Sequence, residues 1–561
     1  MKKILFGLLT LGTVVLGGCY EDKGNYSYNF GDINSVDTLR FTPEAYSGLN
    51  GWIIDFMKSG EADTVTERVT VNPTFSAPDK ADQMDYYWYR QYTWNGQTVK
   101  DTLTTPGYMD VLIPENGNVS YRVILELRDR ETEISYFTQL TVKTREWYTN
   151  SLFVLHGNST QNQRLGNVEF LGDEPTITLD AFERSNTDPN LHEPFKNARV
   201  LGFRMNLYDA EMVVFKTNGE AEVYNPFGLK RLQDTYFVMP PVAVGSNLFV
   251  AKTLINEDPA GASNDFRCVL SNDGRFYISR SSFRFYEPGL NTENTEHLTT
   301  DQYRVSIGTR TGDYYVFWDD QGKRFIHNAI GGNSFPRLDT DGRETASLIT
   351  PVLDSHIDAG ILAKLSGMQP VYAYMNNFNY FQSADEMRFL FYDPATESNM
   401  MCMLTVDGGG GKTKAVTRAD KDEESTAMFA ADTLSLDGLH IEPGTPVVYT
   451  GAYSLDFFFY ADGSTLYRYN VQSGDQDIIY EAPAGYEIVL LKFRQNTDYQ
   501  LWGNLYRYLS IGLNRNNEGA VAEIKLTAAG DLDESFEPQL YEGFDRITDV
   551  QFCNERMYTA E

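Results

Sequence analysis

The residue most able to undergo chemistry stands near the start of the chain, where one cysteine follows a short apolar segment. Two lysines precede an apolar run over residues 4–16, and Leu16-Gly17-Gly18-Cys19 reads as a lipobox. Signal peptidase II cleaves such a sequence before the cysteine, whose thiol then carries diacylglycerol. We therefore predict a lipoprotein signal peptide over residues 1–18 and a lipidation site at Cys19. The alternative is an ordinary secretory signal that contains a cysteine by chance.

The apolar run over residues 4–16 has 13 residues, which is too short for a helix that spans the ~30 Å core of a bilayer. The run is therefore expected to be removed, and the acyl chains on Cys19 are expected to hold the mature protein at the membrane. Membrane contact is thus predicted through the lipid anchor alone.

Two carboxylates lie directly behind the predicted lipid. Glu21 and Asp22 resemble the acidic export signal that sends Bacteroidetes lipoproteins to the outer face of the outer membrane. They therefore predict an outer-membrane, lipid-anchored protein that faces the cell exterior. The alternative is that both residues belong to a solvated tether. Residues 19–34 are polar and rich in Asn, Tyr, Asp and Gly, which is typical of a flexible tether.

Motifs for cofactors and catalysis fail on spacing in the rest of the chain. Gly408-Gly409-Gly410-Gly411-Lys412 is not a phosphate loop, because Val406 occupies the place of the required first glycine. Asp339-Thr340-Asp341-Gly342 resembles part of a calcium loop but lacks the flanking carboxylates, and the six histidines have no paired ligand spacing. We therefore predict no cofactor and no metal site.

Catalytic residues cannot be assigned either. No G-x-S-x-G nucleophile motif occurs, and the 78 acidic residues are too many for a carboxylate pair to be informative. We expect a protein that is not an enzyme and predict no catalytic residue. An enzyme whose catalytic residues are spread over several repeats remains the alternative.

Aromatic side chains in polar surroundings are the better candidates for ligand contact. Phe378 and Tyr380 lie among asparagines, and Trp502 and Tyr506 lie near Gln500 and Asn504. Rings beside amides suit stacking on a sugar or a peptide with hydrogen bonds alongside. We predict these four residues as ligand-binding, with burial in the core as the alternative.

Composition limits the classes of partner and the redox chemistry. The formal net charge is −31 and no cluster of Lys and Arg compensates it, which argues against nucleic acid as a partner. Beyond Cys19, the chain has only Cys268, Cys402 and Cys553, so at most one disulfide can form. We expect all three to be small buried residues of strands.

The pattern of residues 35–146 predicts an immunoglobulin-like β-sandwich. Tyr86–Arg90 and Tyr121–Asp129 largely alternate apolar and polar side chains, as half-buried antiparallel strands do. A further strand is expected over Ser135–Val142, after a turn near Arg130. Trp88 is expected in the core of this domain.

Residues 147–561 repeat a different pattern, in which apolar strands meet at short turns. The expected turn glycines are at positions 219, 274, 322, 463 and 519, and a hairpin without glycine is expected at Asp393–Ser398. Repeats of roughly 50 to 70 residues suit four-stranded blades. We therefore predict a β-propeller of roughly seven blades, with two stacked sandwiches as the alternative. One short helix is expected from a cap at Asp354 or Ser355 to Leu365.

The chain as a whole resembles the PKD-like family lipoproteins of Bacteroidetes. The resemblance rests on Cys19-Tyr20-Glu21-Asp22-Lys23-Gly24-Asn25-Tyr26, on the Ig-like first domain, and on Arg145–Leu155 at the start of the second. Such proteins are usually encoded beside SusC/SusD-type outer-membrane importers. The resemblance therefore implies a cell-surface accessory for nutrient uptake, which binds a peptide or glycan, an importer of this type, or both.

Two other functions stay open at this point. The propeller could instead carry a hydrolase or lyase that acts on polysaccharide or peptide at the cell surface. The chain could also be a purely structural subunit of the importer complex. Close carboxylates in a cleft would favour the enzyme, an aromatic shelf the binding protein, and a broad apolar patch the subunit.

Overall fold

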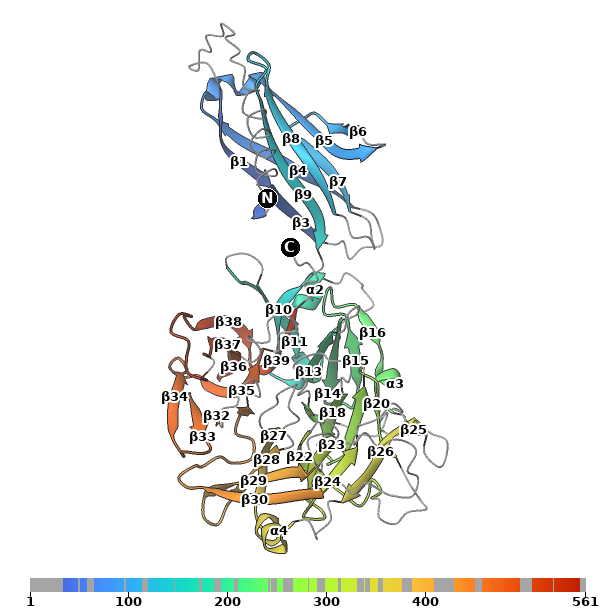
Figure 1. Cartoon of the computed structure of the whole chain (residues 1–561), viewed down its shortest axis with the longest axis vertical. Coiled ribbons are helices and arrows are strands. Elements are labelled where there is room, and N and C mark those ends of the chain that lie inside the picture. The colour runs from blue at the N-terminus through green and yellow to red at the C-terminus, as the bar shows by residue number, and fades with distance from the viewer. Residues whose placement is uncertain are drawn as a thin grey trace, which may run out of the picture. The chain divides into compact units, whose positions relative to one another are not determined.

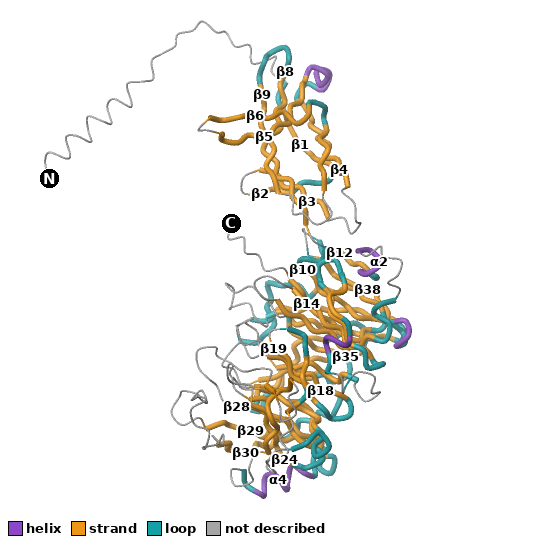
Figure 2. The backbone as a smooth tube through the Cα atoms, turned by 90° about the vertical axis from the view of Figure 1, so that its right-hand side faces the viewer, coloured by secondary structure: helices purple, strands orange, loops and turns teal. Residues whose placement is uncertain are grey.

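The fold is nearly all β, and the chain divides into two compact units, Met1–Arg145 and Glu146–Glu561. The computed structural model describes residues 34–48, 51–57, 65–94, 97–113, 120–145, 147–170, 174–185, 193–205, 210–240, 243, 250–255, 266–280, 282–289, 298–310, 314–329, 337–338, 344–351, 357–375, 386–407, 428–449, 457–494, 507–527 and 529–554. Strands make up most of the described backbone (Figure 2).

The N-terminal unit consists of two sheets that share one core. The smaller sheet has the order β1 (Val36–Thr42), β4 (Val65–Phe75), β7 (Tyr108–Ile113). The larger has the order β2 (Tyr46–Gly48), β3 (Gly51–Met57), β9 (Ser135–Arg145), β8 (Ser120–Asp129), β5 (Met84–Trp94), β6 (Gln97–Thr104). A 3₁₀ helix over Pro78–Gln83 leads into β5. Both sheets contribute apolar side chains to a common buried cluster, which is the arrangement of a β-sandwich.

Trp88 lies at the centre of this core, as the sequence predicts. Its side chain is fully buried on β5, and its indole Nε1 donates a hydrogen bond to the Pro106 carbonyl over 2.9 Å. Burial of a large ring requires that its one polar atom find a partner, and Pro106 supplies it.

The C-terminal unit contains seven sheets that follow one another along the chain (Figure 1). Sheet 1 comprises β12 (Thr176–Thr178), β11 (Arg164–Glu169), β10 (Asn150–His156) and β39 (Ile547–Asn554). Sheet 2 comprises β13 (Ala198–Met205), β14 (Ala210–Lys216), β15 (Ala221–Tyr224) and β16 (Arg231–Gln233). Sheet 3 comprises β17 (Ala251–Ile255), β18 (Phe266–Ser271), β19 (Phe276–Arg280) and β20 (Phe285–Tyr286).

Sheet 4 comprises β22 (Val305–Arg310), β23 (Tyr314–Asp319), β24 (Arg324–Ala329) and β26 (Glu344–Pro351), with β21 (Pro288–Gly289) and β25 (Arg337–Leu338) paired to β26. Sheet 5 comprises β27 (Gln369–Met375), β28 (Glu386–Asp393), β29 (Ser398–Asp407) and β30 (Met428–Leu436). Sheet 6 comprises β31 (Val447–Tyr449), β32 (Phe457–Asp462), β33 (Thr465–Asn470) and β34 (Gln476–Glu481). Sheet 7 comprises β35 (Glu487–Phe493), β36 (Tyr508–Arg515), β37 (Glu518–Lys525) and β38 (Gln539–Asp545).

The central strands of these sheets are apolar on both faces because each sheet packs against two neighbours. On β14, Met212 and Val214 belong to the cluster shared with sheet 1, whereas Val213 and Phe215 belong to the cluster shared with sheet 3. A strand buried on both faces reads as a continuous apolar run rather than an alternating one.

The same packing joins every pair of consecutive sheets among the described residues, and it also joins the last sheet to the first. Sheets 7 and 1 share a buried cluster that contains Val521 from β37 and Val154 from β10. The remaining buried clusters join sheets 3 and 4, 4 and 5, 5 and 6, and 6 and 7. The sheets therefore contact one another in a circular order.

Strand β39, at the C-terminal end of the described chain, completes sheet 1. It pairs with β10 in antiparallel register from Asn150 opposite Asn554 to His156 opposite Ile547 (Figure 1). The two ends of the C-terminal unit thus belong to one sheet, although nearly the whole unit lies between them in sequence.

Several hairpins form where the sequence predicts them. Gly219 and Gly274 have φ angles of 85° and 81°, in the left-handed region that tight turns require, and β28 and β29 meet at Asp393 opposite Ser398. The turn predicted at Gly519 is wrong. Asn516 and Asn517 connect β36 to β37, and Asn516 takes the positive φ of 56°.

Gly519 lies inside β37 instead, opposite Asn514. A side chain at this position would collide with the backbone carbonyl of Asp545 on the adjacent strand. Its glycine therefore serves close packing between β37 and β38, which no local turn pattern reveals.

Helices are short, and the predicted one begins later than expected. The described helices are α2 (Ala181–Ser185), α3 (Thr235–Val238) and α4 (Ala359–Ser366), besides the short 3₁₀ segments. The cap of α4 is Asp358, whose carboxylate accepts a hydrogen bond from the Gly360 amide over 2.6 Å. Gly360 therefore lies in the first turn, and the predicted caps Asp354 and Ser355 lie outside the described residues.

Removal of the Trp88 side chain tests whether the N-terminal unit has its own core. We expect Trp88→Ala to lower the free energy of unfolding of this unit by about 3 to 5 kcal/mol through cavity formation. Phe137→Ala is the control, because this ring on β9 is 59% exposed and its loss should change stability by no more than about 0.5 kcal/mol. Urea unfolding with hydrogen exchange read on peptides of each unit is the measurement. Equal destabilisation of both units would contradict this expectation.

Candidate functional site

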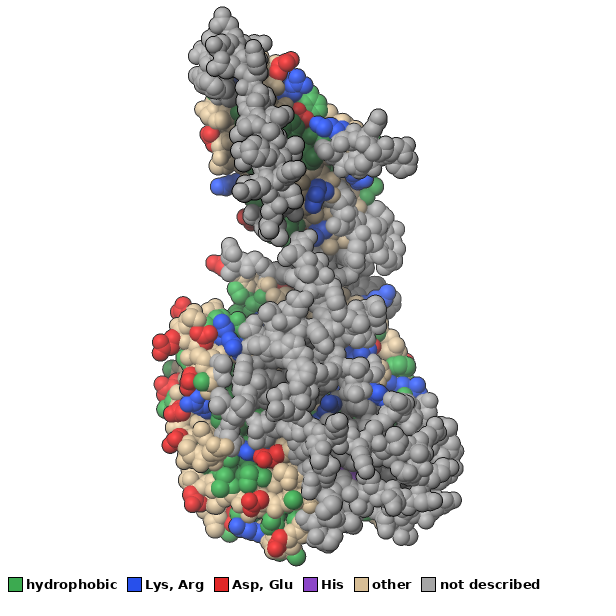
Figure 3. Space-filling view, viewed as in Figure 1, with side chains coloured by type: hydrophobic (Ala, Val, Ile, Leu, Met, Phe, Trp, Pro, Cys, Tyr) green, Lys and Arg blue, Asp and Glu red, His purple; other side chains and the backbone are tan. Residues whose placement is uncertain are grey.

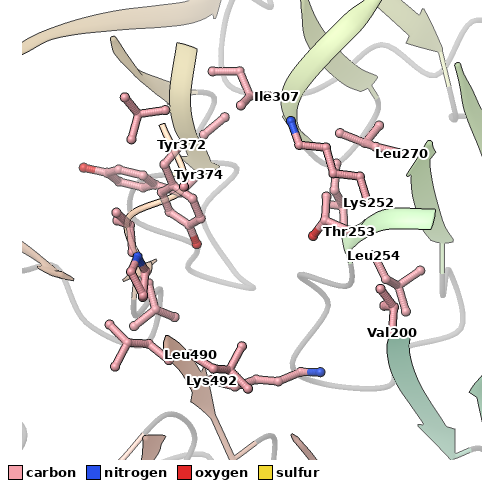
Figure 4. Close-up of a pocket in the computed structure, with 18 of the residues that line it drawn as sticks. Val200, Lys252, Thr253, Leu254, Leu270, Ile307, Tyr372, Tyr374, Leu490 and Lys492 are labelled. Carbon is pink, nitrogen blue, oxygen red and sulfur yellow. The ribbon is translucent and has the colours of Figure 1, made fainter. Parts of the chain in front are cut away.

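A pocket of about 740 Å³ lies among the seven sheets of the C-terminal unit. Residues of β13, β17, β22, β27, β31, β35 and β39 line it, one strand from each sheet, together with Leu270 of β18 and the loop residues 443–446. Side chains from several of these strands surround an open centre (Figure 4). The volume lies within the range of pockets that hold small ligands.

The described lining is mostly apolar, with polar groups at separate positions. Leu254, Ile307 and Leu490 form parts of the wall, and Thr253 lies beside Leu254 on β17 (Figure 4). Tyr372 and Tyr374 of β27 lie across the pocket from β17. Few polar groups on an apolar wall are typical of a binding site that orients its ligand.

Tyr374 is held rigidly by neighbouring rings. It stacks on Tyr449 with ring centroids 4.1 Å apart, and it also contacts Phe458 of sheet 6. Burial raises the pKa of the Tyr374 hydroxyl above its ordinary value, so this group stays neutral and can take part in hydrogen bonds. The ring is only 2% exposed, so it packs sheet 5 against sheet 6 behind the pocket wall.

Three cations and one carboxylate occur among the described lining residues: Arg199, Lys252, Lys492 and Asp549. Lys492 and Asp549 neutralise each other, with Nζ 3.2 Å from Oδ1. Asp549 is only 6% exposed and also accepts hydrogen bonds from the Leu201 amide over 2.7 Å and from the Val550 amide over 2.8 Å.

The pair of Lys492 and Asp549 joins three sheets. Lys492 lies on β35 of sheet 7, Asp549 on β39 of sheet 1, and Leu201 on β13 of sheet 2. Lys492 Nζ also donates to the Leu201 carbonyl over 3.2 Å. The carboxylate thus bonds to both neighbouring sheets from the strand that completes sheet 1.

Lys252 has a different environment. Its ammonium donates to the Ser306 carbonyl over 2.9 Å and forms no ion pair with a described residue. Desolvation lowers the pKa of Lys252 below its ordinary value; the charge of Asp320 opposes this shift, whereas that of Arg199 adds to it. Arg199 forms no hydrogen bond or ion pair with any residue that the structure describes.

The described lining does not supply the usual groups for hydrolysis. Its one carboxylate, Asp549, is fully engaged, whereas glycoside hydrolysis commonly uses two. Within the described residues no group of three or more His, Cys, Asp or Glu side chains could hold a metal ion. Cys268, Cys402 and Cys553 are buried and free, and burial raises the pKa of each thiol, to about 12 for Cys402.

Seven residues predicted from sequence as lipidation, export-signal or ligand-binding sites fall on segments that the structure does not describe. Cys19, Glu21, Asp22, Phe378, Tyr380, Trp502 and Tyr506 all lie outside the described residues, as do the glycine run at 408–412 and the segment 339–342. Sequence reasoning missed Arg199, Lys252, Lys492 and Asp549. Each occurs alone in an ordinary strand, and no spacing connects them before the sheets are assembled.

A second polar cluster holds β38 against β10. The fully buried His156 ring lies 2.8 Å from the Leu179 carbonyl through Nε2, and its Nδ1 accepts a hydrogen bond from the Asp545 amide over 3.1 Å. This pattern fits the neutral ring with the proton on Nε2. Desolvation lowers the pKa of His156 below its ordinary value of 6.5.

Comparison with known proteins adds information for the first third of the chain. Residues 19–194 match the model of the PKD-like family. The PKD-like match covers the N-terminal unit and continues through β10, β11, β12 and α2 of the C-terminal unit. No curated protein matches the sequence. No helix among the described residues is long and apolar enough to cross a membrane.

Solved structures resemble the chain at low identity. A quinoprotein alcohol dehydrogenase-like protein from Bacteroides thetaiotaomicron is 8% identical with a TM-score of 0.41, over 89% of this chain and 96% of that one. PorZ, a surface component of the type IX secretion system of Porphyromonas gingivalis, is 10% identical with a TM-score of 0.34, over 66% of this chain and 35% of its own. The extracellular domain of a putative one-component system from B. thetaiotaomicron is 11% identical with a TM-score of 0.31, over 61% of this chain and 33% of that one.

A double-mutant cycle on Lys492 and Asp549 tests their structural role. We expect Asp549→Ala to destabilise the C-terminal unit by about 2 to 3 kcal/mol, because it leaves the Leu201 amide without its acceptor and the Lys492 ammonium without its counter-charge. Lys492→Met should cost less, and the double variant should recover part of the loss through a coupling of about 1 kcal/mol. Strictly additive losses in urea unfolding would contradict the pairing.

The environment of His156 predicts a pH dependence. Because the folded-state pKa is depressed, the unfolded chain binds a proton near pH 6.5 while the folded chain does not. We expect the free energy of unfolding to fall as the pH drops from about 7 to about 5, and the slope to be shallower in His156→Asn. Urea unfolding of both proteins across this range is the measurement. Parallel curves would show that His156 does not contribute.

Proposed function

We propose that the protein is a cell-surface lipoprotein that captures a nutrient ligand, peptide or glycan, for a SusC/SusD-type outer-membrane importer. The observation that carries the proposal is the pocket to which seven sheets each contribute one strand. The lipobox at Cys19 and the acidic residues Glu21 and Asp22 support anchoring at the outer face of the outer membrane. The PKD-like match supports the family resemblance over residues 19–194.

In this proposal the C-terminal unit is a seven-bladed β-propeller, and the N-terminal unit is an immunoglobulin-like module behind the tether. The circular order of sheet contacts and the pairing of β39 with β10 support the propeller. Propellers arrange four-stranded blades around a central channel, and the strands that line the pocket would then be the innermost strand of each blade.

The chemistry of the described pocket favours capture over catalysis. Its wall offers apolar surface, the partly exposed Tyr372 and separate polar groups, and its single carboxylate is occupied by Lys492 and two backbone amides. Such a site is suited to binding and orienting a ligand.

A structural subunit of the importer complex is the second candidate, and one surface feature favours it. Leu232, Tyr236 and Phe237 of β16 and α3 are exposed, and the Tyr236 side chain is 79% accessible. Exposed apolar residues close together are typical of a contact with another protein. The same surface serves an accessory that both binds ligand and contacts an importer.

Affinity capture of the lipidated protein from outer membranes of its own host tests the proposal. We expect mass spectrometry to find a SusC-type importer and its SusD-type partner among the retained proteins. The matched control is Cys19→Ala, which cannot carry lipid and should be lost from the membrane fraction together with those partners. Recovery of the wild-type protein alone would contradict the complex with an importer.

A further inference from the structure

The charge of the pocket is opposite to that of the protein. The whole chain has a formal net charge of −31, and acidic side chains are scattered over the outer surface of sheets 6 and 7 (Figure 3). The described lining instead carries three cations against one carboxylate. The overall negative charge of the protein repels anions. A local excess of positive charge in the pocket therefore indicates that the pocket favours an anionic ligand.

Only one of the three cations is neutralised. Lys492 Nζ lies 3.2 Å from Asp549 Oδ1, so its charge is balanced by the contact between sheets 7 and 1. Arg199 on β13 and Lys252 on β17 form no ion pair with described residues, and both line the pocket. Sheets 2 and 3 are consecutive, and β13 contacts β17, so the two cations belong to one side of the pocket.

We propose that the pocket selects a ligand that carries a carboxylate, with Arg199 and Lys252 as its binding residues. This inference rests on the proposed capture function and specifies its ligand chemistry. The guanidinium of Arg199 presents two parallel donors that match the two oxygens of a carboxylate, and the ammonium of Lys252 adds a second positive charge.

The rest of the pocket suits a small ligand of this kind. A volume of about 740 Å³ accepts a molecule of two or three sugar rings or a few amino-acid residues. Leu254 and Ile307 offer apolar contact beside the cations, and the Thr253 hydroxyl offers a hydrogen bond. A uronic-acid oligosaccharide and an acidic peptide both combine a carboxylate with such a body.

Isothermal titration of the mature protein with two matched pairs of probes tests the proposal and distinguishes the two sources. The first pair is trigalacturonic acid and galactotriose, and the second is Ala-Glu-Ala and Ala-Gln-Ala with both peptides amidated at the C-terminus. We expect one acidic probe to bind at least about tenfold more tightly than its neutral counterpart. The acidic probe that binds, trigalacturonic acid or Ala-Glu-Ala, identifies the ligand as a saccharide or a peptide.

Substitutions then assign the effect to the two cations. We expect Arg199→Gln and Lys252→Gln each to weaken binding of the acidic probe by about tenfold and to weaken binding of the neutral probe by a clearly smaller factor. The matched controls are Arg40→Gln on β1 and Lys364→Gln on α4, which remove one exposed positive charge each outside the pocket. Arg199→Lys keeps the charge without the paired donors and should give an intermediate loss. If Arg199→Gln fails to fold, Lys252→Gln carries the test.

The outcomes separate this inference from the proposed function. Equal binding of acidic and neutral probes would overturn the charge selection while leaving capture intact. An equal loss in the two control variants would assign the effect to net charge and would also overturn it. Absence of binding by both acidic probes up to about 10 mM would overturn the carboxylate assignment. The affinity capture of an importer from outer membranes tests the proposed function independently of this result.

Discussion

The pairing of β39 with β10 is the constraint on which the C-terminal unit depends. Seven sheets in a row would expose the apolar face of the first and of the last, and each such face holds large side chains. Because the last described strand completes the first sheet, sheets 7 and 1 bury these faces in one shared cluster. Asp549 then holds β39 to sheets 2 and 7 through the Leu201 amide and the Lys492 ammonium.

The pocket is a consequence of the same pairing. Its lining needs one strand from every sheet, including β39, so it exists only when the circular order of contacts is complete. This dependence accounts for the partly buried ion pair in its wall. Lys492 and Asp549 stabilise the junction of sheets 7, 1 and 2, which leaves Arg199 and Lys252 for the ligand that we propose.

Local sequence patterns predict the elements of this fold but not their assembly. Hairpins at Gly219 and Gly274, burial of Trp88 and burial of Cys268 follow from residue types within a few positions of each other. The pairing of β39 with β10 joins strands almost 400 residues apart, and no local pattern contains it. The four charged pocket residues are equally hidden, since each lies in a different strand, and Gly519 serves contact with a neighbouring strand rather than a turn.

Hydrogen exchange of the backbone amides, read by mass spectrometry on the mature protein, tests most directly whether β39 closes the C-terminal unit. If the pairing holds the sheets together, amides of β39 and β10 exchange as slowly as those of β14 and β36, and all four become unprotected together when urea is added. Early exchange of β39 as an independent tail, while the other sheets keep their protection, would contradict this view of the structure.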